Sequence, residues 1–195
     1  LHTAYRRQRQ MCIRDRNKPM SIRKILTEPN PILRQISKPV EKVGIEEQKL
    51  MDDMLDTMYA ANGIGLAAIQ IGVQKRIIVM DLSKESEKKE PRYFVNPVIK
   101  NKSEKISTYE EGCLSVVSIF AEVDRPSTCE VEYLDYNGNK KTLKASGLLA
   151  TCIQHEIDHL NGVLFVDRVS NQEELNLALK EHGFNSNDVK RVQSA

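Results

Sequence analysis

The stretch Gln154-His155-Glu156-Ile157-Asp158-His159 places two histidines four residues apart, with a glutamate directly after the first. On an α-helix, residues four apart lie one above the other on the same face, so His155 and His159 can both reach one metal ion. Glu156 lies about 100° further round the helix, where it is better placed to reach a water molecule beside the metal than to bind the metal itself. This arrangement is typical of metal-dependent hydrolases.

The residues that flank this stretch indicate that its helix is buried. Five apolar side chains recur there at helical spacing, and these are Leu149, Cys152, Ile153, Ile157 and Leu160. A buried imidazole or carboxylate is costly unless it is paired or bound to a metal. A metal site therefore explains three polar side chains on an apolar helix better than a chance pattern on a surface helix does.

The third metal ligand must come from outside this helix, and the downstream sequence offers no suitable residue. Phe165 stands where the metzincin proteases place a third histidine. Glu173 and Glu174 come too early for the glutamate of a thermolysin-like site, and they lie in a polar run. We therefore expect the third ligand upstream.

Four cysteines are possible ligands, and none of them has the C-x-x-C spacing of a zinc ribbon or a thioredoxin-like site. No secretory signal is visible, so disulfides are not expected. Cys12 lies near the N-terminus, and Cys129 alternates with apolar residues as in a strand. Cys152, one turn before the first histidine, is expected to line the site rather than bind the metal. Cys113, beside Gly112, is either a buried strand cysteine or the ligand that completes a catalytic site with one open position.

A third segment, Gly63-Ile64-Gly65-Leu66-Ala67-Ala68-Ile69-Gln70, follows an amphipathic helical pattern. Read alone it is a glycine-rich turn, without the spacing of a phosphate-binding loop. Together with Glu111-Gly112-Cys113-Leu114-Ser115 and the two-histidine stretch, it resembles the three signature segments of the peptide deformylase family. The segments have the family's order and similar separations, and the resemblance runs from about Met20 to the last predicted helix.

The resemblance implies the catalytic residues. The implied metal ligands are Cys113, His155 and His159. Glu156 would act as general base and acid. The side-chain amide of Gln70 and the backbone N–H of Leu114 would stabilise the negative charge on the substrate oxygen.

The resemblance also implies how the substrate is held. The backbone positions that would pair with the substrate peptide are Ile64, Gly65 and Gly112. Cys152 and Ile64 are candidates for the pocket of the methionine side chain. Glu111 would pair with Arg125 and steady the cysteine loop. Two roles remain open for Asp158: it either orients one of the histidines or makes a simple structural hydrogen bond.

The implied reaction is the metal-dependent removal of the N-formyl group from the formylmethionine of newly synthesised polypeptides, with release of formate. One divalent metal ion is expected, Fe²⁺ physiologically, although Zn²⁺, Ni²⁺ and Co²⁺ suit the same ligands. A zinc endopeptidase is the enzyme alternative. An inactive relative that only binds nascent N-termini is the other alternative, and the intact Glu156 and Gln70 argue against it.

The chain departs from the family's pattern after Ser115. Val116-Val117-Ser118 follows there, whereas the family often continues with an apolar residue and then proline. Phe120 stands where many relatives carry a polar or basic residue. Both departures bear on selectivity for substrate side chains and leave the metal site intact.

The charge of the chain is unevenly distributed. The formal net charge is +2, but residues 1–19 hold six basic residues and one acidic residue, so they carry +5 and the remainder carries −3. The basic character therefore gives no argument for DNA binding. Residues 1–19 are expected to be a non-native or disordered extension, because the run from Arg9 to Arg16 looks like translated sequencing-adapter sequence. A transit peptide is the alternative, although this segment contains no serine. Residues 20–195 are expected to form a single peptide deformylase domain, with Met20 as its natural start.

The expected setting is a bacterial-type cytoplasm, although an organellar or phage-encoded origin fits the sequence as well. No apolar run approaches the ~20 residues that a membrane span needs. The expected partner is the N-terminus of formylmethionyl nascent peptides, and the protein is expected to be a monomer. In some relatives a basic C-terminal helix contacts the ribosome. Residues 171–195 have more acidic than basic groups, so they support ribosome contact only weakly.

The expected fold class is α+β, with antiparallel β-sheets wrapped around a central metal-binding helix and with N-terminal and C-terminal helices. Helices are predicted over 45–61, 146–161 and 171–182, and a helical turn begins at Asn30-Pro31. Strands are predicted over 76–82, 92–99, 105–110, 119–123, 129–136, 140–145 and 163–166. Asn137-Gly138 predicts a hairpin between two of these strands.

Overall fold

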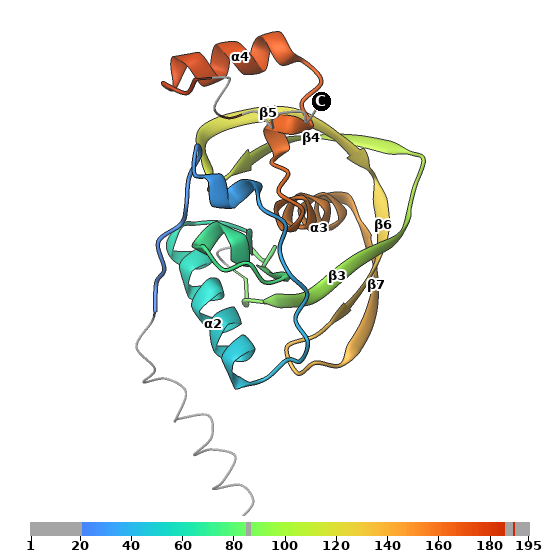
Figure 1. Ribbon diagram of the computed structural model, residues 1–195. Helices are drawn as coiled ribbons and strands as arrows, with labels where there is room; N and C mark the ends of the chain where they lie inside the picture. Colours follow the sequence, from blue (N-terminus) through green and yellow to red (C-terminus); the bar gives the residue numbers. More distant parts are fainter. Residues whose placement is uncertain (1–20, 85–86, 186–188, 190–195) are drawn as a thin grey trace, which may run out of the picture.

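Helix α3, Gly147–Leu160, runs through the middle of the molecule, and the other elements surround it (Figure 1). The computed structural model describes residues 21–84, 87–185 and 189, so the extension expected over residues 1–19 lies outside the described residues. The second half of α3, which carries both histidines, is almost entirely buried. The bounds of α3 match the helix predicted over 146–161.

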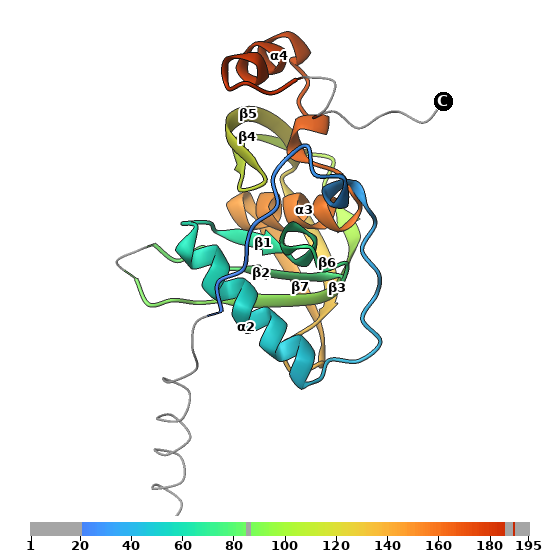
Figure 2. The same ribbon diagram turned by 60° about the vertical axis from the view of Figure 1, so that its left-hand side comes forward.

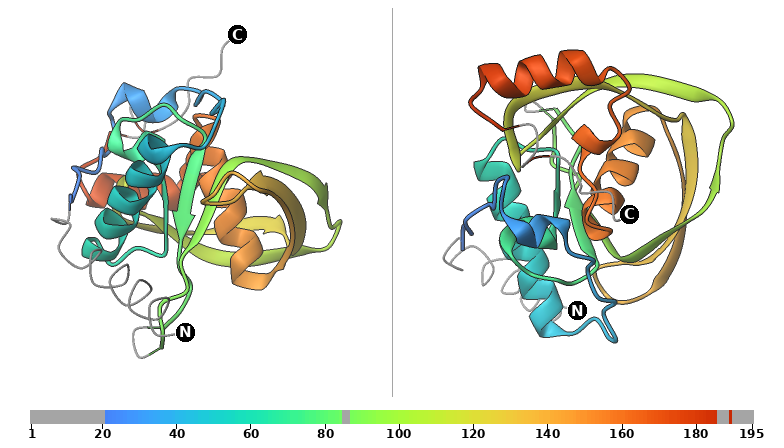
Figure 3. Two further views of the ribbon diagram at one scale, coloured as in Figure 1. Left: turned by 90° about the horizontal axis from the view of Figure 1, so that it is seen from below. Right: turned by 45° about the horizontal axis from the view of Figure 1, so that its top comes forward.

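Two antiparallel sheets curve around α3 (Figures 1 and 3). The larger sheet has the strand order β1-β2-β3-β6-β7, and the smaller one is a hairpin of β4 and β5. The strands of the larger sheet are β1 Gly65–Ala67, β2 Ile77–Met80, β3 Arg92–Lys102, β6 Thr128–Leu134 and β7 Lys140–Ser146. The hairpin consists of β4 Ile106–Cys113 and β5 Val116–Pro126. The predicted α+β class is confirmed.

A bulge in β3 bends the larger sheet. The pairing of β3 with β6 shifts register between Val95 and Val98, and Asn96 within this step has a positive φ of 51°. The Asn96 side chain accepts a hydrogen bond from the backbone N–H of Val40 and donates one to its C=O, each at 2.8 Å. Asparagine tolerates this backbone conformation better than most residues do, and the two bonds to Val40 hold the bulge in place.

The larger sheet is covered on both faces (Figure 2). Helix α2, Ile45–Ala60, packs Met51, Met54 and Met58 against one face, in a cluster with Ile77 and Val79 of β2. Helix α3 packs against the other face, in a cluster with Ile78 and Met80. Alternate residues of β2 thus face the two helices, as the two-residue period of a strand requires. The three methionines of α2 are fully buried, so they belong to the core.

Helix α4, Gln172–Glu181, packs against the β4–β5 hairpin (Figure 3). Leu175 and Leu179 are buried in a cluster with Ile119 and Val123 of β5, whereas Leu177 is 62% exposed. The two buried leucines are four residues apart, so they lie on the one face of α4 that contacts the hairpin. Within the described ranges, no helix is both long enough and apolar enough to cross a membrane.

The two predicted turns are found with some change of form. The helical turn after Asn30 is a 3-10 helix, Pro31–Arg34, and the Asn30 side chain accepts a hydrogen bond from the N–H of Ile32 at 3.0 Å. The hairpin at Asn137-Gly138 is confirmed, with a loop over 135–139 between β6 and β7. In that loop the Asp135 carboxylate accepts hydrogen bonds from the N–H groups of Asn137 and Asn139, each at 2.9 Å.

Two segments differ from the expected secondary structure. The strand predicted over 163–166 is wrong, because this segment leads into a 3-10 turn, Phe165–Asp167. The Asp167 carboxylate closes the turn by accepting a hydrogen bond from the N–H of Leu164 at 2.8 Å. All four residues over 163–166 are buried, and a short apolar run does not distinguish a strand from a buried turn. The segment read as a glycine-rich turn contains strand β1 and a 3-10 helix, Ala68–Ile71.

Candidate metal centre

Three possible metal ligands from two separate elements converge beside α3. Cys113 ends β4, whereas His155 and His159 lie one turn apart on α3. One ligand atom of each residue lies within 4.8 Å of the other two, and the Cys113 Sγ is 3.3 Å from the His159 Nε2. His155 and His159 are buried or nearly so, and Cys113 is half-buried. The structure thus brings together the three residues that the resemblance implies as ligands.

The His155 ring is oriented by a buried carboxylate. Its Nδ1 lies 2.8 Å from the Glu111 Oε2, which leaves Nε2 as the nitrogen available to a metal. Arg125 holds Glu111 in turn, with its Nε 2.5 Å from Oε1 and its Nη2 3.0 Å from Oε2. A carboxylate behind a histidine fixes both the ring and its tautomer, which is common at metal sites.

The charges around the ligands favour a cation. Burial opposes a charge on His155, but its contacts with Cys113 and Glu111 raise the pKa of its ring well above the ordinary value. Burial, followed by repulsion from His155, lowers the pKa of His159 well below the ordinary value. The surroundings of His155 therefore favour positive charge beside Cys113 and Glu111, which a bound divalent cation would supply.

Two buried polar atoms near the ligands have no hydrogen-bond partner within the described part of the chain. These atoms are Glu156 Oε2 and His159 Nδ1. Buried polar atoms are normally paired, so an unpaired carboxylate oxygen here fits a site that holds an ion and a water molecule. A thiolate with two imidazoles suits Fe²⁺, Zn²⁺, Ni²⁺ and Co²⁺. The residues present therefore fit one divalent metal with a fourth position open.

Glu156 packs directly against the backbone of β1. Its side chain is buried, and this burial raises its pKa to about 7. A Cβ atom on Gly65 would lie 2.4 Å from Glu156 Oε1 and 3.0 Å from its Cδ, so only glycine leaves room for the carboxylate. The absence of a side chain at Gly65 thus leaves room for the Glu156 carboxylate in this position.

Gln70 presents its amide nitrogen to the cysteine loop. Its Oε1 accepts a hydrogen bond from the backbone N–H of Ala67 at 2.8 Å. Its Nε2 lies 3.0 Å from the Ser115 Oγ and 3.7 Å from the Cys113 Sγ. Because the oxygen is held on one side, the two N–H groups must face the other. One of them donates to Ser115, and the other is directed at the Cys113 Sγ beside the ligands.

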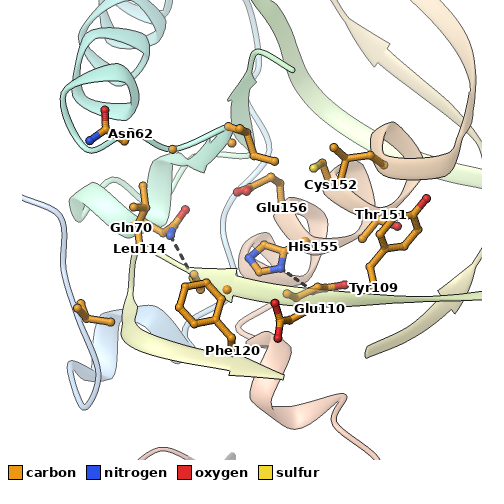
Figure 4. A pocket seen from close by; sticks show the side chains of 18 of the residues that line it. Asn62, Gln70, Tyr109, Glu110, Leu114, Phe120, Thr151, Cys152, His155 and Glu156 are labelled. Atoms are coloured by element: carbon orange, nitrogen blue, oxygen red, sulfur yellow. Dashed lines mark hydrogen bonds and ion pairs between the residues drawn. The ribbon is translucent and has the colours of Figure 1, made fainter. Parts of the chain in front are cut away.

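A pocket of about 440 Å³ opens onto these groups (Figure 4). Gln70, His155 and Glu156 face into it, and Cys152 lines one wall. Four apolar side chains at the pocket are 45–63% exposed, and we call them the apolar rim: Ile64, Val117, Phe120 and Leu148. Exposed apolar side chains gathered around a pocket mark a binding surface.

Every site residue expected from the sequence lies in or behind this pocket. The residues that line it are Ile64, Gly65, Gln70, Glu111, Gly112, Cys113, Leu114, Cys152, His155 and Glu156. His159 lies against Cys113, and Arg125 lies behind Glu111. Sequence reasoning missed the hydrogen bond from Gln70 to Ser115, the contact between Glu111 and His155, and both arginine partners of Asp158. Ser115 lies within a signature segment, whereas no pattern in the sequence marks Arg168.

Replacing Cys113 tests this metal centre. Cys113→Ser should weaken the binding of Co²⁺ to the metal-free protein by more than about 100-fold, because it removes one ligand outright. The absorption band of a thiolate–cobalt bond should disappear with it. Cys152→Ser is the matched control, since it removes another pocket thiol that is not among the three ligands. Unchanged binding by Cys113→Ser, or loss of the band in Cys152→Ser, would contradict the assignment.

Comparisons with known proteins agree with this geometry. The family model for polypeptide deformylase matches residues 22–175. A peptide deformylase from Pelagibacter ubique strain HTCC1062 is 76% identical over 151 residues, which are 77% of this chain and 88% of that protein. A crystal structure of a peptide deformylase from Synechococcus elongatus in complex with actinonin is 43% identical with a TM-score of 0.83, over 90% of this chain and 93% of that one. A probable peptide deformylase from Synechococcus phage S-SSM7 is 46% identical with a TM-score of 0.72, over 74% of this chain and 98% of that one.

These similarities cover all three segments that form the pocket. The chain therefore belongs to the polypeptide deformylase family, metal-dependent enzymes that remove the N-formyl group from nascent peptides.

Proposed function

We propose that this chain hydrolyses the formamide bond of N-formylmethionyl peptides at the pocket described above and releases formate. Family membership supports the reaction. The observation that supports the assignment of residues is the convergence of three ligands, Glu156 and Gln70 on one pocket. In this proposal the metal is held by Cys113, His155 and His159.

Two strand edges beside the pocket support the binding of an extended peptide. β1 is the last strand on its side of the larger sheet, and β4 pairs with β5 alone among the named strands. Gly65 of β1 and Gly112 of β4 both line the pocket, as does Ile64. An extended peptide can add to such edges through its backbone N–H and C=O groups. We propose these three backbone positions as the ones that hold the nascent N-terminus.

Cys152 and Ile64 are proposed to receive the methionine side chain. Cys152 lines the pocket, and burial raises the pKa of its thiol to about 12, so the thiol stays neutral at working pH. A neutral thiol and aliphatic carbons suit a polarisable thioether. The rest of the apolar rim would contact the residues that follow the methionine.

A divalent metal bound by the three ligands would supply a water-derived nucleophile at neutral pH. Negative charge develops on the formyl oxygen during attack, and hydrogen-bond donors fixed near that oxygen stabilise it. We assign these donors to the Gln70 Nε2 and to the backbone N–H of Leu114, the residue after Cys113. The Gln70 amide is already turned toward the ligands by its bond to Ala67. A preorganised donor of this kind contributes about 3 kcal/mol.

Glu156 is proposed to move the proton. It would accept a proton from the attacking water and then donate it to the nitrogen of the departing amine. These two steps use the same carboxyl group in opposite protonation states, so a pKa near the working pH suits both of them. Burial raises the pKa of Glu156 to about 7 in the metal-free chain.

We further propose Fe²⁺ as the physiological ion, the cytoplasm as the location and the monomer as the active form. The ligand chemistry supports iron and three other metals equally, so supply would determine occupancy. Bacterial relatives support the location. Contact with ribosomal RNA is not part of the proposal, because the exposed charged residues of α4 include more acids than bases.

Formate release from formyl-Met-Ala-Ser by anaerobically purified protein tests the function, with metal analysis of the same sample. We expect formate from the formylated peptide and no product from the same peptide without the formyl group. Cleavage of internal peptide bonds would support the endopeptidase instead. Binding of the formylated peptide by the metal-loaded protein without turnover would support the inactive relative. Either result would overturn the proposal.

Glu156→Gln should lower kcat by about 10²–10⁴-fold, because an amide cannot accept the proton. The variant should keep its metal, since Glu156 is not among the three ligands. Glu122→Gln, at an exposed position on β5, is the control for loss of one carboxylate. Equal turnover by Glu156→Gln and the unchanged chain would refute the assigned role.

Gly65→Ala should lower kcat by about 100-fold at full metal content, because the new methyl group displaces the Glu156 carboxylate. The double variant with Glu156→Asp identifies the cause, since the shorter side chain withdraws from the new methyl group. We expect Glu156→Asp to cost less in the Gly65→Ala background than in the unchanged chain. Strictly additive losses would mean that Gly65 acts through something other than Glu156.

A further inference from the structure

Asp158 accepts hydrogen bonds from two arginines that come from different parts of the chain. The Arg125 Nη1 lies 2.8 Å from its Oδ2. Arg168, directly after the 3-10 turn that follows α3, donates from Nη2 to Oδ1 at 2.7 Å and from Nε to Oδ2 at 3.1 Å. Arg168 thus grips the carboxylate with two bonds, while Arg125 contacts it with one.

These contacts continue without interruption to the metal ligand His155. Arg168 binds Asp158, Asp158 binds Arg125, Arg125 binds Glu111 with two bonds, and Glu111 binds the His155 Nδ1. Each link is 3.1 Å or shorter. We call these five residues the arginine–carboxylate chain. Arg168 is its outer end, with a side chain that is 49% exposed, whereas the other side chains are 5–11% exposed.

In the arginine–carboxylate chain, the guanidinium groups equal the carboxylates in number only when Arg168 is present. Two carboxylates, Glu111 and Asp158, face two guanidinium groups, Arg125 and Arg168. Without Arg168, two nearly buried carboxylates would share one arginine. A buried carboxylate that loses its partner is strongly unfavourable, so Asp158 would compete with Glu111 for Arg125 or turn toward water.

The geometry of α3 connects this competition to the metal centre. Asp158 and His155 are three residues apart on α3, so they lie on the same face of the helix, one turn from each other. Contacts at both positions fix the rotation of α3 about its axis. The same rotation sets where the His155 and His159 rings lie relative to Cys113 on β4.

We propose that Arg168 is a positioning residue for the metal centre, acting from the surface through Asp158, Arg125 and Glu111 on the orientation of His155. Arg168 does not touch the reacting atoms. It lines a separate polar cavity of about 200 Å³, which it shares with Gln154 and Ile157 of α3, and it is not among the residues that line the substrate pocket. The inference rests on the metal site of the proposed function.

Arg168→Gln tests the proposal, with metal retention as its readout. The zinc-loaded protein is mixed with excess chelator and the rate of metal release is measured. We expect release to be faster by about 10-fold or more, in line with the effect of removing other groups that orient a metal ligand. Arg168→Lys keeps the charge but loses the two-bond grip, so its release rate should lie between those of Arg168→Gln and the unchanged chain.

Arg23→Gln is a matched control. Arg23 also grips one buried aspartate with two bonds, from Nη2 at 2.7 Å and Nε at 3.3 Å, and its side chain is 40% exposed. Its partner Asp53 lies on α2 and has no part in the arginine–carboxylate chain. Arg23→Gln should lower Tm about equally with and without metal and should leave metal release unchanged.

Thermal unfolding separates positioning from general stabilisation. Because a metal that binds only the folded state raises Tm according to its affinity, weaker binding reduces the difference in Tm between loaded and metal-free protein. We expect this difference to shrink in Arg168→Gln and to persist in Arg23→Gln. Equal metal release and an equal Tm difference in the two variants would overturn the inference. Failure of the unchanged chain to bind metal would instead overturn the proposed function on which it rests.

Discussion

Glu156 and His159 are buried, and His155 is nearly so, on one turn of a helix that the rest of the protein surrounds. Such groups are costly in an apolar interior unless something neutralises or pairs with them. Glu111 and Arg125 satisfy one side of His155. On the other side, the arrangement fits a cation held jointly with the Cys113 sulfur from a different element. The position of Cys113 relative to α3 is therefore the constraint on which the site depends.

Several features of the fold maintain that position. The β4–β5 hairpin that carries Cys113 is held against α4 by the cluster around Leu175 and Leu179. The same hairpin carries Glu111 and Arg125, so Cys113 and the residues that orient His155 belong to one structural unit. β1 approaches from the larger sheet, and the lack of a side chain at Gly65 lets Glu156 lie against it. The substrate pocket is the space left between these elements, which explains why two strand edges border it.

The parts of this arrangement that depend on local periodicity can be predicted from the sequence. The four-residue spacing of His155 and His159 can be read from sequence, because any helix places such residues on one face. The residues alone did not decide the role of Cys113, because a ligand cysteine and a buried strand cysteine share the same local pattern. The family resemblance is what favoured the ligand. The prediction of a strand over 163–166 is wrong, because the apolar residues there are buried around a 3-10 turn rather than paired in a sheet. The arginine partners of Asp158 could not be predicted from the sequence, because ion pairs between separate elements leave no periodic signal.

The coordination of the bound metal tests the central claim most directly. X-ray absorption at the zinc edge of the zinc-loaded protein measures the number and type of ligand atoms. The account predicts one sulfur at about 2.3 Å and two imidazole nitrogens with one further light atom at about 2.0–2.1 Å. A first shell without sulfur, or one with two sulfurs, would contradict a site made by Cys113 and the two histidines of α3.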